Sequence, residues 1–471
     1  MLGYAVSRGI TLLSTLVLAR LLAPEDIGVV LTAMVIVAAL NLLSDTGLGV
    51  SLVVREHLDD RFAGTVLVCM VASATLLAVL SAVAAPLFAA LLGARQLQSI
   101  IPFLSITVVF STIGWFFQSM LQRGLLFARR FAGLAALSVG YAVVGISAAA
   151  AGAGPWSLVA GQLAGTGLSA LVFFVATPHR VRPCFDLPKA REAYRESRAF
   201  LAQALTSFLT MNLHFVAVAG VLGSRSMGVY SMAFRLSELP SQALAVPVAQ
   251  ATFPAFARMR SEQGARTSAL LTSLRYVVLA GLPPLVGLAV LARPFADGVL
   301  GPKWSDVPPL LILLSVGGAA ALVAAVVAWF VNALGGASWL ARINLRLLYS
   351  APAVFAAALI FHSALAVGVV IVVDALVELG LLLRYVHRNM GVRALDLWRG
   401  LRGLFAASAG LAAAAFATDL ALRTVGVDAV PRLAAGAAAG AVAYLALILL
   451  LERRILVDGR GLARRALGRG V

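Results

Sequence analysis

The polar turn between the first two apolar runs of the chain has the sequence Leu22-Ala23-Pro24-Glu25-Asp26-Ile27-Gly28-Val29. A similar stretch returns 200 residues later as Leu222-Gly223-Ser224-Arg225-Ser226-Met227-Gly228-Val229. Many membrane transporters are built from internal repeats of this kind. The repeat predicts two halves of similar structure, each opening with a helical hairpin. Because the repeating unit has an even number of helices, we expect both halves to have the same orientation, related by an axis along the membrane normal.

Lipid is the expected solvent of this chain. Its 471 residues are 61% hydrophobic and only 12% charged, and the mean hydropathy is +0.97. That is more apolar side chain than one water-soluble core can bury. The first apolar run begins at Leu2, with no basic region before it and no cleavage signature after it. We therefore expect it to be a retained helix and not a signal peptide.

Apolar runs separated by polar breaks predict an all-α polytopic membrane protein of about fourteen transmembrane helices. Each run is long enough to cross a hydrocarbon layer of roughly 30 Å as a helix. The predicted helices cover residues 3–22, 27–54, 62–91, 99–121, 131–152, 155–176, 199–222, 227–253, 269–292, 307–333, 338–361, 364–386, 400–422 and 431–451.

The basic residues test this count, since cytoplasmic loops of membrane proteins carry an excess of Lys and Arg. With a cytoplasmic N-terminus, 25 of the 37 basic residues fall in inside loops and seven in outside loops. A missed helix would scramble this alternation, so we expect both termini to be cytoplasmic. The same topology explains the net charge of +17, because the basic residues are scattered among short loops and form no face for nucleic acid.

The repeat and the longest hydrophilic connection divide the chain into four parts. Residues 1–176 are expected to form a first lobe of six helices, and residues 199–388 a second one. Pseudo-two-fold symmetry is expected to relate the two lobes. Residues 177–198 are the predicted cytoplasmic linker between the lobes, and residues 389–471 contain two further helices and a basic cytoplasmic tail.

The opening hairpin resembles that of the Wzx-type oligosaccharide flippases through Leu18-Ala19-Arg20-Leu21-Leu22-Ala23-Pro24-Glu25-Asp26-Ile27-Gly28, Asp45-Thr46-Gly47-Leu48-Gly49 and Arg55. The second half resembles the eighth helix of that family through Val221-Leu222-Gly223, Met227-Gly228-Val229-Tyr230-Ser231-Met232-Ala233-Phe234-Arg235-Leu236, Leu239-Pro240 and Phe253-Pro254. The resemblance covers helices one, two, seven and eight. Elsewhere it rests on hydropathy and on the twelve-plus-two helix count.

This resemblance implies the two-lobed fold shared by polysaccharide flippases, lipid II flippases and multidrug and toxic-compound extruders. It implies a protein of the bacterial inner membrane that moves an undecaprenyl-diphosphate-linked oligosaccharide to the outer leaflet by alternating access, for exopolysaccharide, capsule or O-antigen biosynthesis. The implied partners are this glycolipid, membrane lipids, H⁺ or Na⁺, and a polysaccharide polymerase. The sequence does not name the sugar.

Ionisable and polar residues at membrane depth are the candidates for substrate binding, since they are costly there unless they face a water-filled cavity or one another. They are Arg8 in the first helix, Asn212 and His214 in the seventh, and Arg235 and Glu238 in the eighth. In the resembled fold these helices line the cleft between the lobes. The planar donor fork of arginine suits a diphosphate. Alternatively, Arg235 and Glu238 neutralise each other, and His214 is a packing residue.

Three carboxylates are candidates for coupling to an ion. Asp374 and Glu378 lie four residues apart on the twelfth predicted helix, so they share one face and could carry a proton or a sodium ion. Asp45 lies near the end of the second predicted helix. Structural roles are the alternative, with Arg346 and Arg384 as partners of the first two carboxylates and a helix-end role for Asp45.

Small residues near these motifs are expected to serve packing. Gly28, Gly47, Gly49 and Gly228 fit turns and close helix contacts. Cys69 lies in an apolar run and Cys184 in a basic loop, so a disulfide between them is not expected, and neither has a metal-ligand spacing.

Absent motifs narrow the function. Without a Gly-x-x-x-x-Gly-Lys-Ser/Thr loop, the chain does not hydrolyse ATP in the manner of a P-loop transporter, and no cofactor is expected. Metal-binding or serine-hydrolase motifs are also missing, which argues against an enzyme and against a metal site. Two alternatives remain: a multidrug or small-solute antiporter of the same fold, and a membrane polysaccharide polymerase or ligase. The latter typically has a larger external loop than residues 293–307 provide.

Overall fold

The computed structural model describes residues 2–45, 48, 49, 52, 55, 58–178, 181–245, 248, 263–347 and 349–452. Helices dominate these residues, and no strand occurs among them. The chain forms two compact units, unit 1 from Met1–Ser231 with Ala351–Ala364 and unit 2 from Met232–Ser350 with Leu365–Val471. The predicted all-α class is confirmed. It follows from the solvent, because a helix satisfies every backbone hydrogen bond within one segment, where lipid offers no partner.

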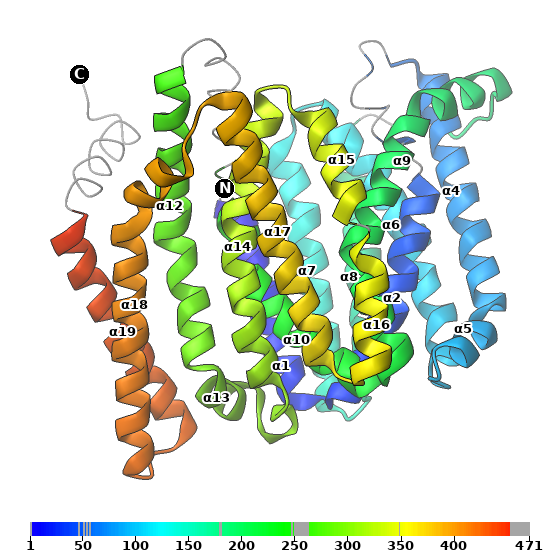
Figure 1. Cartoon of the computed structure of the whole chain (residues 1–471). Helices are drawn as coiled ribbons and strands as arrows, with labels where there is room; N and C mark the ends of the chain where they lie inside the picture. The colour runs from blue at the N-terminus through cyan, green and yellow to red at the C-terminus, as the bar shows by residue number, and fades with distance from the viewer. Residues whose placement is uncertain are drawn as a thin grey trace. The chain divides into compact units, whose positions relative to one another are not determined.

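Unit 1 is a bundle of long helices with one short helix across an end (Figure 1). Its elements are α1 (Leu2–Leu21), α2 (Pro24–Asp45), α4 (Asp60–Val83), α5 (Ala85–Leu91), α6 (Leu97–Arg123), α7 (Phe127–Ala150), α8 (Pro155–Ala176), α9 (Leu187–Ala217), the π-helical turn η1 (Val218–Leu222), the start of α10 (Gly223–Pro240) and most of α16 (Ser350–Phe361). Its core includes the side chains of Phe62, Met70 and Phe116, each at most 1% exposed. Helices α2, α4 and α6 pack around them.

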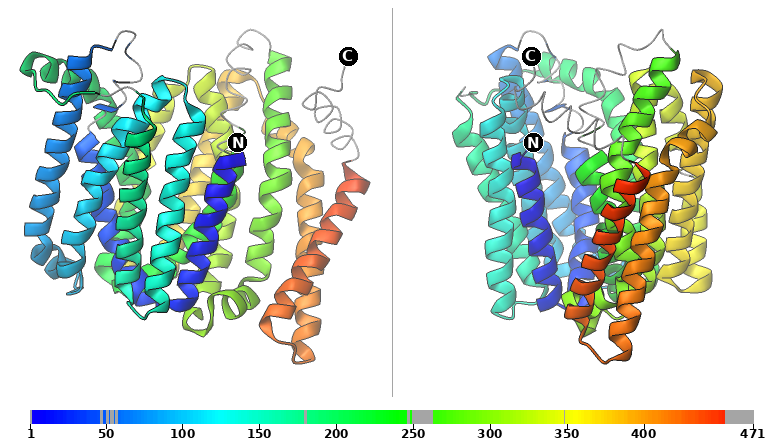
Figure 2. Two further views of the ribbon diagram at one scale, coloured as in Figure 1. Left: turned by 180° about the vertical axis from the view of Figure 1, so that it is seen from behind. Right: turned by 90° about the vertical axis from the view of Figure 1, so that its left-hand side faces the viewer.

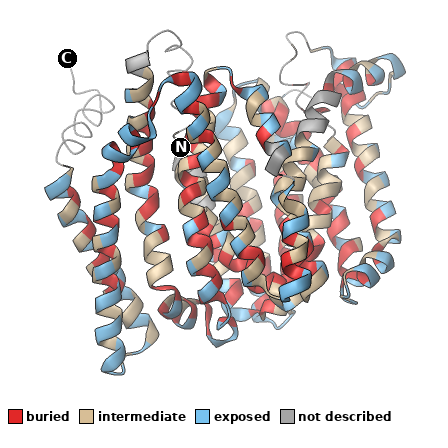
Figure 3. Cartoon of the chain, in the orientation of Figure 1, coloured by how far each residue is buried: buried red, intermediate tan, exposed pale blue. Residues whose placement is uncertain are grey.

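Unit 2 begins within α10 and contains the remaining elements. These are η2 (Ser241–Ala245), α12 (Gln263–Val290), α13 (Ala292–Phe295), η3 (Ala296–Leu300), η4 (Pro302–Trp304), α14 (Val307–Ala333), α15 (Ala337–Leu347), α17 (Ala364–Met390), α18 (Ala394–Thr424) and α19 (Ala429–Leu451). The core lies between α12, α14, α17 and α18, with side chains such as Leu274, Val327 and Leu404 fully buried. Helices α18 and α19 pack against each other. Many of their residues are exposed (Figure 3), and these include large apolar ones such as Phe416, Leu445 and Leu449.

Within the described residues, eleven helical stretches are long and apolar enough to cross a membrane. Two shorter apolar stretches, Gly9–Leu21 and Ser350–Phe361, belong to α1 and α16. One of the eleven, Ala204–Leu244, includes both α9 and α10. The helical direction changes inside it at Gly223, where φ is +81°, a value that glycine adopts at little cost. The count of fourteen stays a prediction.

Two predicted single helices are wrong, because each is a pair. The helix predicted over residues 62–91 is α4 followed by α5, separated at Ala84 with Pro86 in the first turn of α5. Proline lacks the N–H that would continue the preceding helix, and its ring clashes with the turn before it. The helix predicted over residues 338–361 is α15 followed by α16, and Pro352 lies in the first turn of the latter.

Helix α9 starts at Leu187, earlier than the predicted start at residue 199. Asp186 is its N-cap and accepts a hydrogen bond from the Lys189 backbone N–H at 3.3 Å, and Pro188 occupies the first turn. The predicted linker is therefore helical over its second half. Predicted helical residues 46, 47, 50, 51, 53, 54, 246, 247, 249–253 and 348, and the basic tail beyond residue 452, lie outside the described residues.

Glycines bring α7 and α8 close together. A Cβ atom built on Gly165 would lie 2.7 Å from the Leu137 carbonyl oxygen, and one on Gly161 would lie 3.0 Å from that of Tyr141. The Ser169 hydroxyl donates to the Gly133 carbonyl at 2.9 Å across the same pair of helices. Small residues and interhelical hydrogen bonds are the usual means of joining helices in lipid, where no hydrophobic force drives them together.

Polar contacts tie further helices to each unit. In unit 1, α1 runs beside α7 (Figure 2), and the hydroxyls of Ser7 and Ser138 lie 2.7 Å apart. In unit 2, the Tyr444 hydroxyl of α19 donates to the Leu279 carbonyl of α12 at 2.7 Å. The Arg275 Nε donates to the Gly400 carbonyl at 3.1 Å. These bonds fix helices whose outer faces are apolar.

We expect Gly165→Leu to lower the free energy of unfolding by about 1–3 kcal/mol, the usual cost of overpacking a close contact. Thermal unfolding of the detergent-solubilised protein measures this change. Gly380→Leu is the matched control, because a Cβ atom on Gly380 of α17 meets nothing within 4 Å. Equal melting temperatures for the two variants would contradict the packing role of Gly165.

Candidate functional site

The residues predicted to bind substrate are divided between the two units. Arg8, Asn212 and His214 belong to unit 1, on α1 and α9. Arg235 and Glu238 belong to unit 2, on the second half of α10. The backbone of Arg8 is helical, whereas its side chain lies outside the described residues. Assembly of these five residues into one site stays a prediction.

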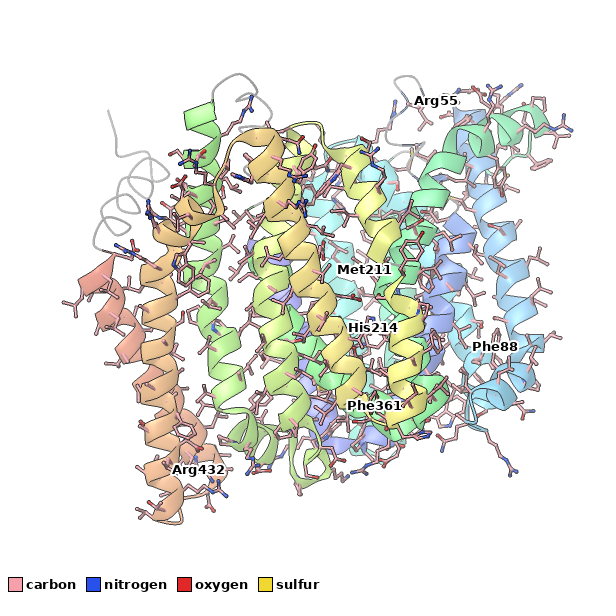
Figure 4. All side chains as sticks on the ribbon, viewed as in Figure 1. Arg55, Phe88, Met211, His214, Phe361 and Arg432 are labelled. Atoms are coloured by element: carbon pink, nitrogen blue, oxygen red, sulfur yellow. The ribbon has the colours of Figure 1, made fainter. Side chains whose placement is uncertain are left out.

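His214 lies in the last turn of α9, three residues after Met211 (Figure 4). Its imidazole is only 4% exposed. The ring centroid lies 4.2 Å from that of Phe215 and 5.7 Å from that of Tyr230 on α10. Two residues earlier, the Asn212 side-chain amide donates to the Phe208 carbonyl of its own helix at 2.9 Å. In this conformation, aromatic packing surrounds the histidine, and the asparagine amide N–H bonds to the helix backbone.

Arg235 and Glu238 lie three positions apart on α10, as the sequence predicts. The Arg235 side chain is exposed and that of Glu238 is half-buried. One carboxylate oxygen of Glu238 accepts a hydrogen bond from the Gln242 side chain at 2.9 Å. This polar cluster extends from α10 into η2, so Gln242 is a neighbour that the sequence motifs did not single out.

Asp45 is the last residue of α2, and its carboxylate accepts a hydrogen bond from the Gly49 backbone N–H at 3.0 Å. A Cβ atom on Gly49 would lie 2.3 Å from the Trp115 indole nitrogen. The carboxylate therefore joins the end of α2 to the backbone of Gly49, which fits the helix-end role left open by the sequence. An ion-coupling role stays a prediction.

Asp374 and Glu378 lie one helical turn apart on α17, and both are half-buried. The Ser350 hydroxyl at the start of α16 is hydrogen bonded to Asp374. Two carboxylates on adjacent turns repel each other when both are ionised, so this arrangement favours a shared or bound cation. No group of three or more His, Cys, Asp or Glu residues suited to a metal occurs among the residues described.

Unit 1 also contains a charged cluster between α4 and α9, which the sequence motifs did not reveal. We define this α4–α9 charge cluster as Arg55, Asp59, Arg123, Lys189 and Glu192. Lys189 pairs with Asp59, and Arg55 pairs with Glu192. The Arg123 guanidinium donates to the Leu52 carbonyl at 3.1 Å and also to the Arg55 carbonyl. Each ion pair joins residues more than 100 positions apart in the sequence, so no local sequence pattern indicates it.

Close backbone packing reinforces this cluster. A Cβ atom on Gly64 of α4 would lie 2.3 Å from the Arg182 carbonyl oxygen, and the Cys184 Sγ lies 3.3 Å from the Arg61 carbonyl. Ala190 and Ala193 form the buried face of the first turns of α9. Cys69 and Cys184 are both free thiols. The first turns of α9 are thus attached to unit 1 by packing and by charge.

Comparison with known proteins gives a consistent result. Residues 17–309 match a family described as polysaccharide biosynthesis protein. The chain is 28% identical to the succinoglycan biosynthesis transport protein ExoT of Rhizobium meliloti, over 95% of this chain and 91% of that protein. It is 25% identical to the lipopolysaccharide biosynthesis protein WzxC of Escherichia coli, over 66% of this chain and 63% of that protein.

Solved structures of transporters share the fold. A lipid II flippase, MurJ, in an inward closed conformation superposes with a TM-score of 0.80 at 14% identity, over 97% of this chain and 99% of that one. A multidrug transporter of the MATE family in an inward-facing conformation gives a TM-score of 0.58 at 14% identity, over 81% of this chain and 94% of that one. The predicted fold class is confirmed by both likenesses.

The Asp59 carboxylate makes the attachment of α9 dependent on pH. Its pKa lies below the ordinary value because the Lys189 ammonium bonds to it and the Arg61 N–H donates to it. A depressed pKa contributes stability above the unfolded-state pKa and loses it as the pH falls through the folded-state pKa. We expect wild type to melt at a higher temperature than Asp59→Asn at neutral pH, and the difference to vanish between about pH 5 and pH 2.

Differential scanning fluorimetry across this pH range measures the difference. Asp428→Asn is the control, because Asp428 is exposed and makes no capping hydrogen bond. A gap between wild type and Asp59→Asn that is independent of pH would rule out the ionised pair as its source.

Proposed function

The chain belongs to the polysaccharide biosynthesis protein family, and from that premise we propose that it is a flippase. It moves an undecaprenyl-diphosphate-linked oligosaccharide from the inner to the outer leaflet of the cytoplasmic membrane, for exopolysaccharide, capsule or O-antigen biosynthesis. The observation that carries this proposal is the likeness to a succinoglycan biosynthesis transport protein over almost the whole of both chains.

The fold supports transport but does not choose the cargo. A lipid II flippase and a multidrug transporter both superpose on this chain. The choice of a saccharide rests on the sequence relatives, whose names concern polysaccharides of three kinds: succinoglycan, lipopolysaccharide and teichuronic acid. The name of the first of these relatives states transport, and both superposed structures are those of transporters, which supports transport as the activity.

The proposed orientation places both termini in the cytoplasm. In unit 1, Arg55 lies at the end where α9 begins, and Phe88 lies near the opposite end (Figure 4). The α4–α9 charge cluster therefore collects basic residues at one end of this unit, in keeping with a cytoplasmic side. The turn between α2 and α1 and the turn before α10 then face outwards.

Arg8 and Arg235 hold the diphosphate in this proposal, with Asn212, His214 and Glu238 as neighbours that bind sugar hydroxyls. A guanidinium offers several N–H donors in a plane, which matches phosphate oxygens bidentately. Two cations on separate helices can release the diphosphate when the helices move apart.

We expect Arg235→Ala to slow flipping roughly tenfold or more, because a hydrogen bond to a charged group contributes about 1.5–3 kcal/mol. The measurement is the leaflet-resolved accessibility of lipid-linked oligosaccharide in membrane vesicles from cells with wild-type protein, with the variant, or with none. Arg95→Ala is the matched control, because Arg95 is exposed in the turn between α5 and α6.

Cells without the protein should retain the glycolipid in the inner leaflet. Unchanged sidedness in those cells, with no second flippase present, would contradict the saccharide substrate. Normal flipping by folded Arg235→Ala protein would contradict only the cationic site.

We also propose that Asp374 and Glu378 couple flipping to a cation gradient, with Asp45 as a weaker candidate because of its bond to Gly49. Collapsing the proton or sodium gradient with an ionophore should then slow flipping by wild type. Asp374→Asn with Glu378→Gln should be slow already and insensitive to the ionophore. Equal ionophore sensitivity of the double variant and wild type would exclude these carboxylates as the coupling site.

A further inference from the structure

The start of α2 and the start of α10 meet at two glycines within unit 1. A Cβ atom on Gly28 would lie 1.7 Å from the Ser224 carbonyl oxygen. A Cβ atom on Gly228 would lie 1.9 Å from the Pro24 carbonyl oxygen. Real Cβ atoms do not approach an oxygen so closely, so only glycine fits at either position. Each helix therefore rests its backbone against the glycine of the other.

This contact is reciprocal, and its symmetry is that of the sequence repeat. The repeat relates Pro24 to Ser224 and Gly28 to Gly228 by an offset of 200 residues. Exchanging the two copies turns one glycine contact into the other, which is the property of an isologous two-fold interface. The equivalent positions Glu25 and Arg225 form an ion pair across it at 2.7 Å.

We propose that this α2–α10 clasp, made of Pro24, Glu25 and Gly28 with Ser224, Arg225 and Gly228, is the outer gate of the transporter. The proposal rests on the proposed function and orientation, which place the starts of α2 and α10 on the outer side. The clasp joins the first helical hairpin of one repeat to that of the other. A glycolipid headgroup leaving between the repeats on the outer side needs these two helices to separate.

Its two components suit a gate that opens repeatedly. The glycine contact tolerates no inserted side chain, so the closed state is sharply defined by shape. The ion pair is half-exposed on both sides, with the two side chains 52% and 46% accessible. Water can therefore solvate both charges when the helices separate, which keeps the opening reversible. Two residues after each member of the pair, Met227 on α10 is 1% exposed and Ile27 on α2 is 6% exposed.

A buried reporter adjacent to the clasp tests this proposal without knowledge of the substrate. The reporter is Met227→Cys in a background lacking both native thiols, Cys69→Ala with Cys184→Ser. A membrane-impermeant maleimide is added outside intact cells, and its labelling rate is measured. We expect Gly28→Leu and Gly228→Leu each to raise that rate at least tenfold, because either side chain forces the helices apart. Gly380→Leu is the matched control and should leave the rate unchanged.

Exchange of the charges isolates the ion pair. Glu25→Arg and Arg225→Glu each place like charges opposite one another, so each should raise the labelling rate. The double exchange restores an opposite-charge pair and should return the rate to within about twofold of the reporter background. A merely structural role for either residue would not predict this rescue.

Closure is tested by locking the clasp in a flipping assay. Glu25→Cys with Arg225→Cys is bridged by a short bis-methanethiosulfonate crosslinker, which should stop glycolipid flipping until a reductant releases it. Normal labelling rates in both folded glycine variants, or flipping at the wild-type rate by fully crosslinked protein, would overturn the gate. If glycolipid sidedness proves independent of the protein, the saccharide function fails, whereas raised labelling of the glycine variants still supports the gate.

Discussion

The absence of water in the hydrocarbon layer is the constraint on which this structure depends. Every backbone group must find its partner inside its own helix, so the chain becomes a set of helices joined by short polar turns. Lipid also removes the hydrophobic force between helices. Their association therefore relies on other means: glycine contacts such as those of Gly165 and Gly161 in α8, and shared hydroxyls such as that of Ser7. Charges gather at the ends of helices, where water returns.

Much of the fold could be predicted from hydropathy, because a run of apolar residues of sufficient length has one solution in lipid. The errors in predicted helix boundaries occurred where one or two residues, such as a proline or a helix cap, override the mean hydropathy of the run. Pro86 divides one apolar run into α4 and α5. Asp186 starts α9 within a polar stretch that hydropathy assigns to a linker. Capping and proline chemistry decide such positions, and they act over one turn of helix.

The candidate site was less accessible from the sequence. Arg235 and Glu238, or Asp374 and Glu378, can be placed on one helix face from their spacing alone. The α4–α9 charge cluster cannot, because its partners meet only after the chain has folded. The glycines were predicted in part. Close contacts were expected at Gly28, Gly49 and Gly228 and are confirmed there. Gly47 lies outside the described residues. The sequence did not predict that Gly28 packs against the start of α10 and Gly228 against the start of α2.

That reciprocity has an evolutionary consequence. After an ancestral duplication, two copies of a gene segment usually drift apart, since each mutates under its own constraints. Here each copy supplies the carbonyl against which the glycine of the other is seated, as Ser224 does for Gly28. A mutation in one half is therefore selected through its effect on the other. The paired positions of the repeat should therefore stay similar in sequence long after the surrounding helices of the two copies have diverged.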